Sequence, residues 1–225
     1  METKEFMNNL LNKLLPLVNQ KIIISDEKEL FDQSVYKDKI IIVLEGEYKL
    51  THILPNSKEF TIGYYKAPNI LLPNNKNNDN FMALFTMKIK SKCTIGLIPY
   101  DEKSLSEDIW CDFYNYSDLI SQKIYIQMRD LLFNTKQNAL FSILIRFSNS
   151  YGVKVNNGIK INIKLSNIDL AEYIGTTPET ISRILRVIKE NRLIKYEDKY
   201  IIITNIEYMK NQLDCKYCEN RLCEI

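Results

Sequence analysis

Histidine is almost absent from this chain of 225 residues, which contains only His52. With a single histidine, no Ser-His-Asp or Cys-His arrangement with an assignable base is visible, and neither is a pair of carboxylates suited to acid–base catalysis. We therefore expect a protein that is not an enzyme. A lone histidine in a strand-like stretch is far more often a surface or packing residue than a ligand, so His52 receives no role.

Long hydrophobic runs are also missing. The most apolar early stretch, LLNKLLPLV, is short and is broken by a lysine and a proline, so neither a membrane span nor a signal peptide is expected. The composition, 45% apolar and 26% charged, is typical of a soluble globular protein. We expect a cytoplasmic location with no membrane partner, and in that reducing compartment five cysteines argue against a disulfide framework.

The net charge is only +2, but the charges are unevenly distributed. From Arg129 to Lys195 there are eleven Lys and Arg against five Asp and Glu. A locally basic half in an otherwise neutral chain is the footprint expected of a DNA-binding domain.

Residues 166–190, SNIDLAEYIGTTPETISRILRVIKE, carry the signals of two helices joined by a tight turn. Ser166 and Asp169 have the spacing of a capping box, which satisfies free N–H groups at a helix start. Gly175 enters a left-handed turn cheaply and ends the first helix. Thr177 then offers a second cap, with Pro178 at the first helical position. The pattern predicts a helix-turn-helix.

The second predicted helix has two faces at helical spacing. Its apolar stripe consists of Ile181, Ile184, Leu185 and Ile188, and its polar face of Glu179, Ser182, Arg183 and Arg186. Arg183 can fork onto the two acceptors of a guanine, and Glu179 can accept from the amino group of a cytosine. On spacing alone, the alternative is an ordinary solvated helix with local Glu–Arg pairs.

The segment GTTPETISRIL resembles the recognition helix of the Crp/Fnr family of bacterial regulators, and its E-x-x-S-R core is similar to the Fnr branch. The resemblance implies that Glu179, Ser182 and Arg183 read the bases of each half-site in double-stranded DNA. Pro178 stands where some branches place a base- or phosphate-contacting residue, which leaves the exact target sequence open. The candidate DNA-binding residues are Thr177, Glu179, Thr180, Ser182, Arg183 and Arg186.

Upstream, short runs of Ile, Val, Tyr, Phe and Thr broken by turn residues indicate an antiparallel sandwich or roll over residues 21–99. The segment VLEGEYKLT, with Gly46 at a turn, resembles the opening of the family's cyclic-nucleotide-binding roll. Yet GYYKAPNILLPNNKNNDNFMAL lacks the Gly-Glu pair and the arginine that hold cyclic AMP, and it offers a phosphate only Lys66 or Lys76. No cyclic nucleotide is expected to bind in the usual manner.

Helical periodicity returns at residues 105–134, with one apolar seam formed by Ile120, Ile124, Met128 and Leu131. A homodimer through this seam is favoured over packing against the roll, because helix-turn-helix proteins usually bind paired half-sites. Two hairpins, expected to turn at Asn157-Gly158 and at Glu197-Asp198, add a wing to the helix-turn-helix.

The predicted fold is therefore α+β, in four parts. These are a cyclic-nucleotide-binding-like β-roll at residues 1–104, a dimerisation helix at 105–135, a winged helix-turn-helix at 136–210 and a cysteine-rich tail at 211–225.

Three of the five cysteines lie in that tail, in the pattern C-x2-C-x4-C. Thiolates select zinc or iron–sulfur clusters, and spacing alone leaves a cluster, a zinc site and an unliganded tail equally open. A dithiol oxidoreductase would usually need a βαβ context, which is absent. Cys93 and Cys111 are expected to be small apolar fillers. By local sequence alone, Asp130 beside Arg129 would be a surface ion pair.

The tail resembles that of Fnr-type regulators from low-GC Gram-positive bacteria, and so do MRDLL, ALFSILIRFSNSYGV and NGIKINIKLSNIDLAEY. This resemblance implies a 4Fe–4S cluster held by Cys215, Cys218 and Cys223, with Asp130 as the fourth ligand. It also implies an oxygen- or nitric-oxide-responsive activator of anaerobic genes that works with RNA polymerase. Our hypothesis is that cluster binding holds two recognition helices at half-site spacing. The alternative is a regulator with a structural zinc or an unliganded tail that senses a small molecule in the roll.

Overall fold

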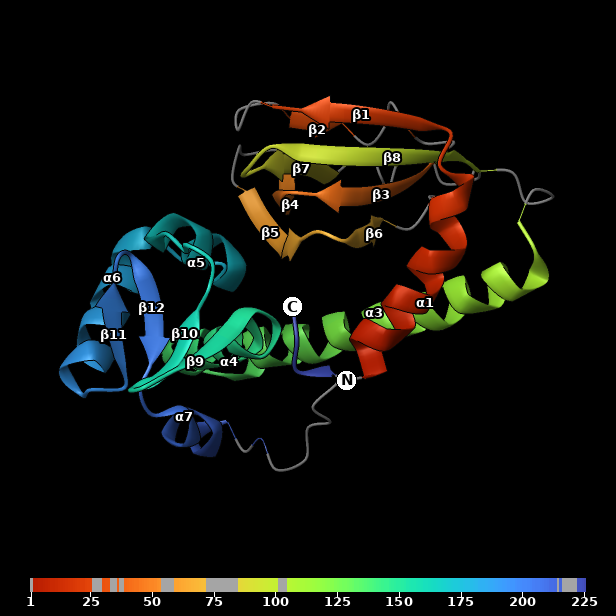
Figure 1. Ribbon diagram of the computed structural model, residues 1–225. Coiled ribbons are helices and arrows are strands. Elements are labelled where there is room, and N and C mark those ends of the chain that lie inside the picture. The colour runs from red at the N-terminus through yellow and green to blue at the C-terminus, as the bar shows by residue number, and fades with distance from the viewer. Residues whose placement is uncertain are drawn as a thin grey trace. The chain divides into compact units, whose positions relative to one another are not determined.

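The computed structural model describes residues 2–25, 30–32, 36, 39–53, 59–71, 85–100, 105–213, 215 and 222–225. The chain forms two compact units, Met1–Ile120 and Ser121–Ile225, and the boundary between them falls inside helix α3 (Glu107–Phe133) (Figure 1). The predicted α+β fold, with a β-rich N-terminal part, a long helix and a C-terminal helix-turn-helix, is confirmed. Among the described residues, no helix has the length and apolar character needed to cross a membrane.

The N-terminal unit contains two antiparallel four-stranded sheets (Figure 1). One has the order β1 (Gln20–Ile24), β8 (Cys93–Pro99), β3 (Lys39–Glu45), β6 (Asn69–Leu71). The other has the order β2 (Leu30–Asp32), β7 (Phe85–Ile89), β4 (Glu47–Ile53), β5 (Glu59–Lys66). Gly46 joins β3 to β4 at φ +101°, where a Cβ atom would lie 2.5 Å from the Lys92 carbonyl oxygen. The predicted turn therefore requires glycine for both its φ angle and its close packing.

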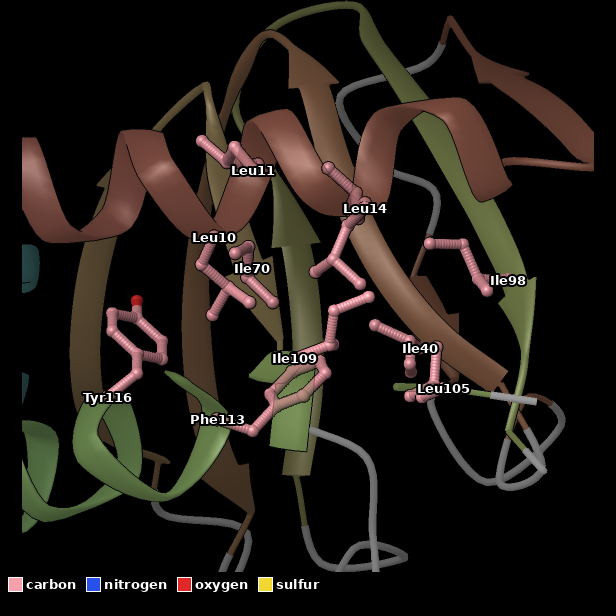
Figure 2. Packing of buried hydrophobic residues seen from close by; sticks show 11 residues of the cluster. Leu10, Leu11, Leu14, Ile40, Ile70, Ile98, Leu105, Ile109, Phe113 and Tyr116 are labelled. Carbon is pink, nitrogen blue, oxygen red and sulfur yellow. The ribbon is translucent and has the colours of Figure 1, made fainter. Parts of the chain in front are cut away.

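Helix α1 (Glu2–Leu14), the short helix η1 (Leu15–Leu17) and the start of α3 belong to the same unit. Leu10, Leu11 and Leu14 recur at helical spacing on α1, and all three are buried. Figure 2 shows these leucines and α3 residues such as Phe113 converging on side chains of the sheet. Lys13 strengthens the contact between the two helices, because its amine lies 2.5 Å from Asp108 and 2.6 Å from Asp112.

Helix α3 exposes part of the predicted apolar seam. Ile124 and Met128 are 48% and 53% exposed, whereas Ile120 packs against the N-terminal core. Cys93 is fully buried, which confirms the prediction that it is a small apolar filler. The same prediction for Cys111 is wrong. Cys111 is exposed because the inward face of the first turns of α3 is occupied by Ile109, Phe113 and Tyr116.

The C-terminal unit combines helices with one four-stranded sheet, ordered β11-β12-β10-β9. Its helices are α4 (Lys136–Tyr151), α5 (Asn167–Ile174), α6 (Pro178–Glu190) and α7 (Ile206–Gln212). Its strands are β9 (Gly152–Val155), β10 (Gly158–Ile161), β11 (Ile194–Glu197) and β12 (Tyr200–Ile203). Both predicted hairpins are present, but α7 had no counterpart among the predicted elements.

The first hairpin turns one residue earlier than predicted. Val155 pairs with Gly158, so the turn residues are 156 and 157 and Gly158 already belongs to β10. Gly158 has φ +137°, and a Cβ atom there would lie 2.0 Å from the carbonyl oxygen of Ile203 on β12. This glycine is required for the close approach of two strands and not for the turn itself.

The second hairpin turns one residue later than predicted. Glu197 pairs with Tyr200, which leaves Asp198 and Lys199 as the turn, with φ values of 50° and 69°. Two consecutive positive φ values are what the tight two-residue turn favoured between twisted strands demands.

Candidate functional site

The helix-turn-helix is held together by the caps that its sequence predicts. The Ser166 hydroxyl accepts from the Asp169 N–H at 3.1 Å, and the Asp169 carboxylate accepts from the Ser166 N–H at 3.0 Å. Gly175 ends α5 in the left-handed conformation, at φ 62°. Thr177 then caps α6 by accepting from the Thr180 N–H at 3.3 Å. Two candidate DNA-binding residues, Thr177 and Thr180, thus also define where α6 begins.

Helix α6 separates its apolar and polar side chains as predicted. Ile181, Leu185 and Ile188 are buried and fix the helix to the core of the unit. Ser182 and Arg183, on the opposite face, are exposed. The helix can therefore contact a partner through its polar face without disturbing its own packing.

That polar face lines an open depression of about 460 Å³. The lining residues are Pro178, Glu179, Ser182, Arg183 and Arg186. Hydrogen bonds from its own backbone N–H and from Thr177 hold the pKa of Glu179 below its ordinary value, so this side chain is a hydrogen-bond acceptor at neutral pH. Two guanidinium donors and one carboxylate acceptor on an exposed helix match the donor and acceptor pattern of base edges in a major groove.

A second constellation surrounds Asp130, near the end of α3. This carboxylate is 8% exposed, and its Oδ2 atom accepts from the Ser142 hydroxyl at 2.6 Å and from Arg146 Nη2 at 3.1 Å. Its Oδ1 atom accepts from Arg129, from Nε at 3.1 Å and from Nη2 at 2.8 Å. Burial acts to raise the pKa of Asp130, but the hydrogen bonds from Ser142, Arg129 and Arg146 outweigh it and hold the pKa below its ordinary value. Asp130 is thus a buried network centre and not a surface ion pair.

The end of the chain returns to α3 and α4 (Figure 1). Arg146 Nη1 donates to the carbonyl of Leu222 at 2.8 Å, and Asn149 Nδ2 donates to the carbonyl of Cys223 at 2.6 Å. Glu224 lies 3.3 Å from the Lys123 amine on α3. Burial lowers the pKa of Lys123 despite the opposing effect of Glu224. The backbone N–H of Ile225 donates to the Ser150 hydroxyl on α4 at 2.9 Å.

These two features meet at a cavity of about 10 Å³. Its lining consists of Arg129, Asp130, Ser142, Ile145, Arg146, Leu213, Cys215 and Cys223. The structure thus brings together three of the four predicted metal ligands around one cavity, while Cys218 lies outside the described residues. Among the described residues, no three His, Cys, Asp or Glu side chains form a group that could hold a metal ion.

The donor set of this cavity nevertheless has a clear chemistry. Thiolates suit zinc and iron–sulfur clusters. A carboxylate oxygen is a harder ligand, which zinc and iron also accept. A volume of about 10 Å³ accommodates roughly one water-sized group. A single ion suits this volume directly, whereas a four-iron group would require the lining to open.

Ser142 and Arg146 are the residues of this site that sequence reasoning missed. The available signal was Arg146 itself, a lone charge inside the apolar run NALFSILIRFSNS. A charged group on a buried helix face needs a charged or hydrogen-bonding partner inside the protein.

The fold and the exposed helix α6 define a winged helix-turn-helix protein with an N-terminal β-roll. Residues 139–212 match the family model of the Crp-like helix-turn-helix domain. The chain is 26% identical over 220 residues to the anaerobic regulatory protein of Bacillus subtilis, covering 96% of this chain and 92% of that protein. It is 24% identical over 193 residues to the listeriolysin regulatory protein of Listeria monocytogenes, covering 82% of this chain and 81% of that protein.

Solved structures share the fold at low sequence identity. FixK2 from Bradyrhizobium japonicum is similar with a TM-score of 0.69 at 12% identity, over 86% of this chain and 96% of that one. A transcriptional regulator of the CRP family from Thermus thermophilus is similar with a TM-score of 0.66 at 10% identity, over 87% of this chain and 93% of that one. Residues 139–212 are therefore a Crp-like helix-turn-helix domain, and the chain shares the fold of solved Crp/Fnr-type structures.

Proposed function

We propose that this protein is a homodimeric, cytoplasmic transcriptional regulator that binds paired half-sites in double-stranded DNA and responds to oxygen or nitric oxide. The sensor would be a 4Fe–4S cluster held by Cys215, Cys218, Cys223 and Asp130. One observation carries the proposal: two tail cysteines and a buried carboxylate line the same cavity, within the compact unit that also contains α6. The similarity to the anaerobic regulatory protein of Bacillus subtilis also supports it.

The DNA-reading roles fall on the exposed face of α6. Arg183 would donate to a guanine, Glu179 would accept from a cytosine amino group, and Ser182 lies between them on the same face. Arg186 continues that face toward the end of the helix and adds positive charge. Thr177 and Thr180 stand at the start of α6, where N–H groups and hydroxyls favour a phosphate. Where the protein activates, RNA polymerase would be a further partner.

A second copy of the chain would cover the exposed apolar face of α3. Ile124, Met128 and Leu132 are 48%, 53% and 67% exposed. Neighbouring apolar side chains with this exposure to water are unusual in a monomer and are typical of an interaction surface. A symmetric pair of such helices buries the face in both copies and presents two α6 helices to two half-sites.

In the proposed metal centre, the chain supplies three soft thiolate donors and one harder carboxylate. Asp130 is a carboxylate at neutral pH despite its burial, because its hydrogen bonds outweigh the effect of burial and keep its pKa below the ordinary value. A bound cluster would supply iron that reacts with oxygen and nitric oxide. The carboxylate is the more labile donor, so the corner next to Asp130 would be the more open to attack.

An anaerobic purification tests the sensor. The expected result is a brown protein containing iron and acid-labile sulfide, which loses its colour in air and binds a palindromic DNA site tightly only before exposure. Cys218→Ala should abolish both the colour and specific DNA binding while leaving a folded dimer. Cys111→Ala is the matched control, because Cys111 is exposed on α3, and it should keep both. Tight and specific DNA binding by colourless Cys218→Ala would refute the proposal.

The volume of the cavity favours one other candidate, a structural zinc. A space of about 10 Å³ suits a single ion better than a four-iron group. The regulator would then sense a small molecule in the β-roll. Zinc without sulfide in the anaerobically purified protein would favour this candidate over the cluster.

A further inference from the structure

We propose that Arg146 is a positioning residue that docks the C-terminal tail onto Asp130 through contacts between protein groups alone. The metal-related consequence rests on the cluster proposed above, but the docking itself does not. In this view Cys223 and the Asp130 carboxylate are held at one cavity by α4, and the tail has no need of a metal to find its place.

The side chain of Arg146 joins three parts of the unit. It is 2% exposed and lies in the middle of α4 among ten consecutive buried residues. Its Nη1 atom donates to the Leu222 carbonyl at 2.8 Å, and its Nη2 atom donates to Asp130 Oδ2 at 3.1 Å. Nε lies 3.4 Å from the Ser142 hydroxyl on the same helix. A buried guanidinium is tolerated only when its donors are paired, so the tail carbonyl and the carboxylate are both needed where they stand.

The point of attachment fixes the tail next to a thiol. Leu222 directly precedes Cys223, so holding the Leu222 carbonyl limits where the Cys223 side chain can go. Asn149 adds a second hold on the Cys223 carbonyl at 2.6 Å. Both contacts run through main-chain oxygens, so chemistry at the thiol does not consume them.

The two oxygens of Asp130 are held differently. Oδ2 accepts from Ser142 and Arg146, both buried on α4. Oδ1 accepts from Arg129, whose side chain is 46% exposed. A guanidinium this exposed can exchange its partner for water at little cost, whereas the buried contacts cannot be exchanged. Oδ1 is therefore the oxygen that can change partner, while Arg146 and Ser142 keep the carboxylate oriented, as outer-shell groups do for ligating carboxylates.

Alkylation of the full-length, reduced protein in the presence of a chelator tests the docking. Peptide mass spectrometry would follow how fast iodoacetamide modifies Cys223, with the exposed Cys111 as the internal reference. We expect Cys223 in the wild type to react more slowly than Cys111, and Arg146→Gln to speed the Cys223 reaction about tenfold. Arg129→Gln is the matched control, because it removes a half-exposed guanidinium from Oδ1 and leaves both Arg146 contacts in place, and it should change the Cys223 rate much less than Arg146→Gln does.

A milder variant and a measurement on the wild type guard against misfolding of Arg146→Gln. Arg146→Lys keeps the charge but cannot span both partners, so it should give an intermediate Cys223 rate. Hydrogen exchange on the chelated wild type should show protection of the Ile225 amide, which donates to the Ser150 hydroxyl. Equal Cys223 rates in the wild type, Arg146→Lys and Arg146→Gln would overturn the proposal, and so would an unprotected Ile225 amide.

Failure of the docking and failure of the proposed sensor give different results. Protein that never contains sulfide but shows a slow, Arg146-dependent Cys223 reaction would refute the cluster and keep the docking. Brown protein in which Cys223 reacts as fast in the wild type as in Arg146→Gln would refute the docking and keep the cluster. If both hold, the colour of Arg146→Lys should fade in air about tenfold faster than that of the wild type.

Discussion

Replacing Asp130 with alanine should destabilise the C-terminal unit even when no metal is available. The carboxylate accepts hydrogen bonds from Ser142, Arg129 and Arg146. Without it, the Arg146 guanidinium remains buried, at 2% exposure, and loses the carboxylate with which it forms an ion pair. Removing one partner of a buried ion pair typically costs about 3–5 kcal/mol. Against a usual total stability of about 5–15 kcal/mol, that loss is large.

Two further variants separate the parts of this cost. Arg129 is half-exposed, so Arg129→Gln should lower the free energy of unfolding by less than about 1 kcal/mol. The double variant Asp130→Ala with Arg146→Met removes both buried charges and leaves an apolar side chain of similar length. It should be more stable than Asp130→Ala alone by about 2 kcal/mol or more, because no unpaired buried charge remains.

Urea unfolding followed by circular dichroism, in chelator and reductant, measures these differences. A loss of less than about 1 kcal/mol in Asp130→Ala would refute the reasoning, because it would mean that Arg146 pays no penalty for losing its partner. So would a double variant less stable than Asp130→Ala. The result also bears on the sensor: if Asp130 stabilises the metal-free protein, a colourless Asp130→Ala protein does not by itself identify Asp130 as a ligand. Cysteine variants are then the sharper test.

Three other predictions concern single positions in the interior of one unit or the other. Ile181→Ala should lower the free energy of unfolding by about 2–5 kcal/mol in a urea titration, because Ile181 is fully buried on the inner face of α6, while Lys189→Ala on the exposed side should change it by less than about 0.5 kcal/mol. Gly158→Ala should lower the melting temperature by several degrees, because a Cβ atom at φ +137° would lie 2.0 Å from the Ile203 carbonyl oxygen; an unchanged melting temperature would contradict this. Burial raises the pKa of the Cys93 thiol from 9.0 to about 11, so the unfolded chain ionises first and stability should be full below pH 9 and fall as the pH rises to 11. Cys93→Ala should remove that part of the alkaline loss in urea titrations repeated across this range.

Local chemistry explains which elements could be predicted from the sequence. The caps formed by Ser166 and Thr177 depend on residues within three positions of each other, so their spacing alone indicates the hydrogen bonds found in the structure. The two faces of α6 follow from helical periodicity for the same reason. The first hairpin turns one residue earlier than predicted, because the preference of glycine for tight turns assigns Gly158 to the turn. The structure shows that it is needed where β10 meets β12, a contact between residues distant in sequence.

The surroundings of Asp130 illustrate the opposite case. Its neighbour Arg129 is visible in the sequence and is indeed a partner. The lone charge of Arg146 in an apolar run indicates a buried partner, but nothing local to Asp130 shows that α4 covers its other oxygen. Burial is decided by the packing of distant segments, and here it converts a weak surface interaction into the centre of a network. The same holds for the C-terminal tail. Its cysteine spacing is a local pattern that the sequence shows, but its attachment to Arg146 joins residues far apart in the chain.

The position of α4 limits what the tail can do to the recognition helix. Asp130, the tail and α6 belong to one compact unit, Ser121–Ile225. At its start, α4 holds the end of α5 through Lys136, whose amine donates to the Ile174 carbonyl at 3.0 Å, directly before the Gly175 turn that leads to α6. Because α4 through α6 share a tightly packed core, a change at the tail cannot loosen α6 without opening that core. We expect the tail to act on DNA binding chiefly by moving α4, α5 and α6 together against α3, which carries the proposed dimer face. Such a movement would change the spacing of two α6 helices in a dimer and leave each helix intact.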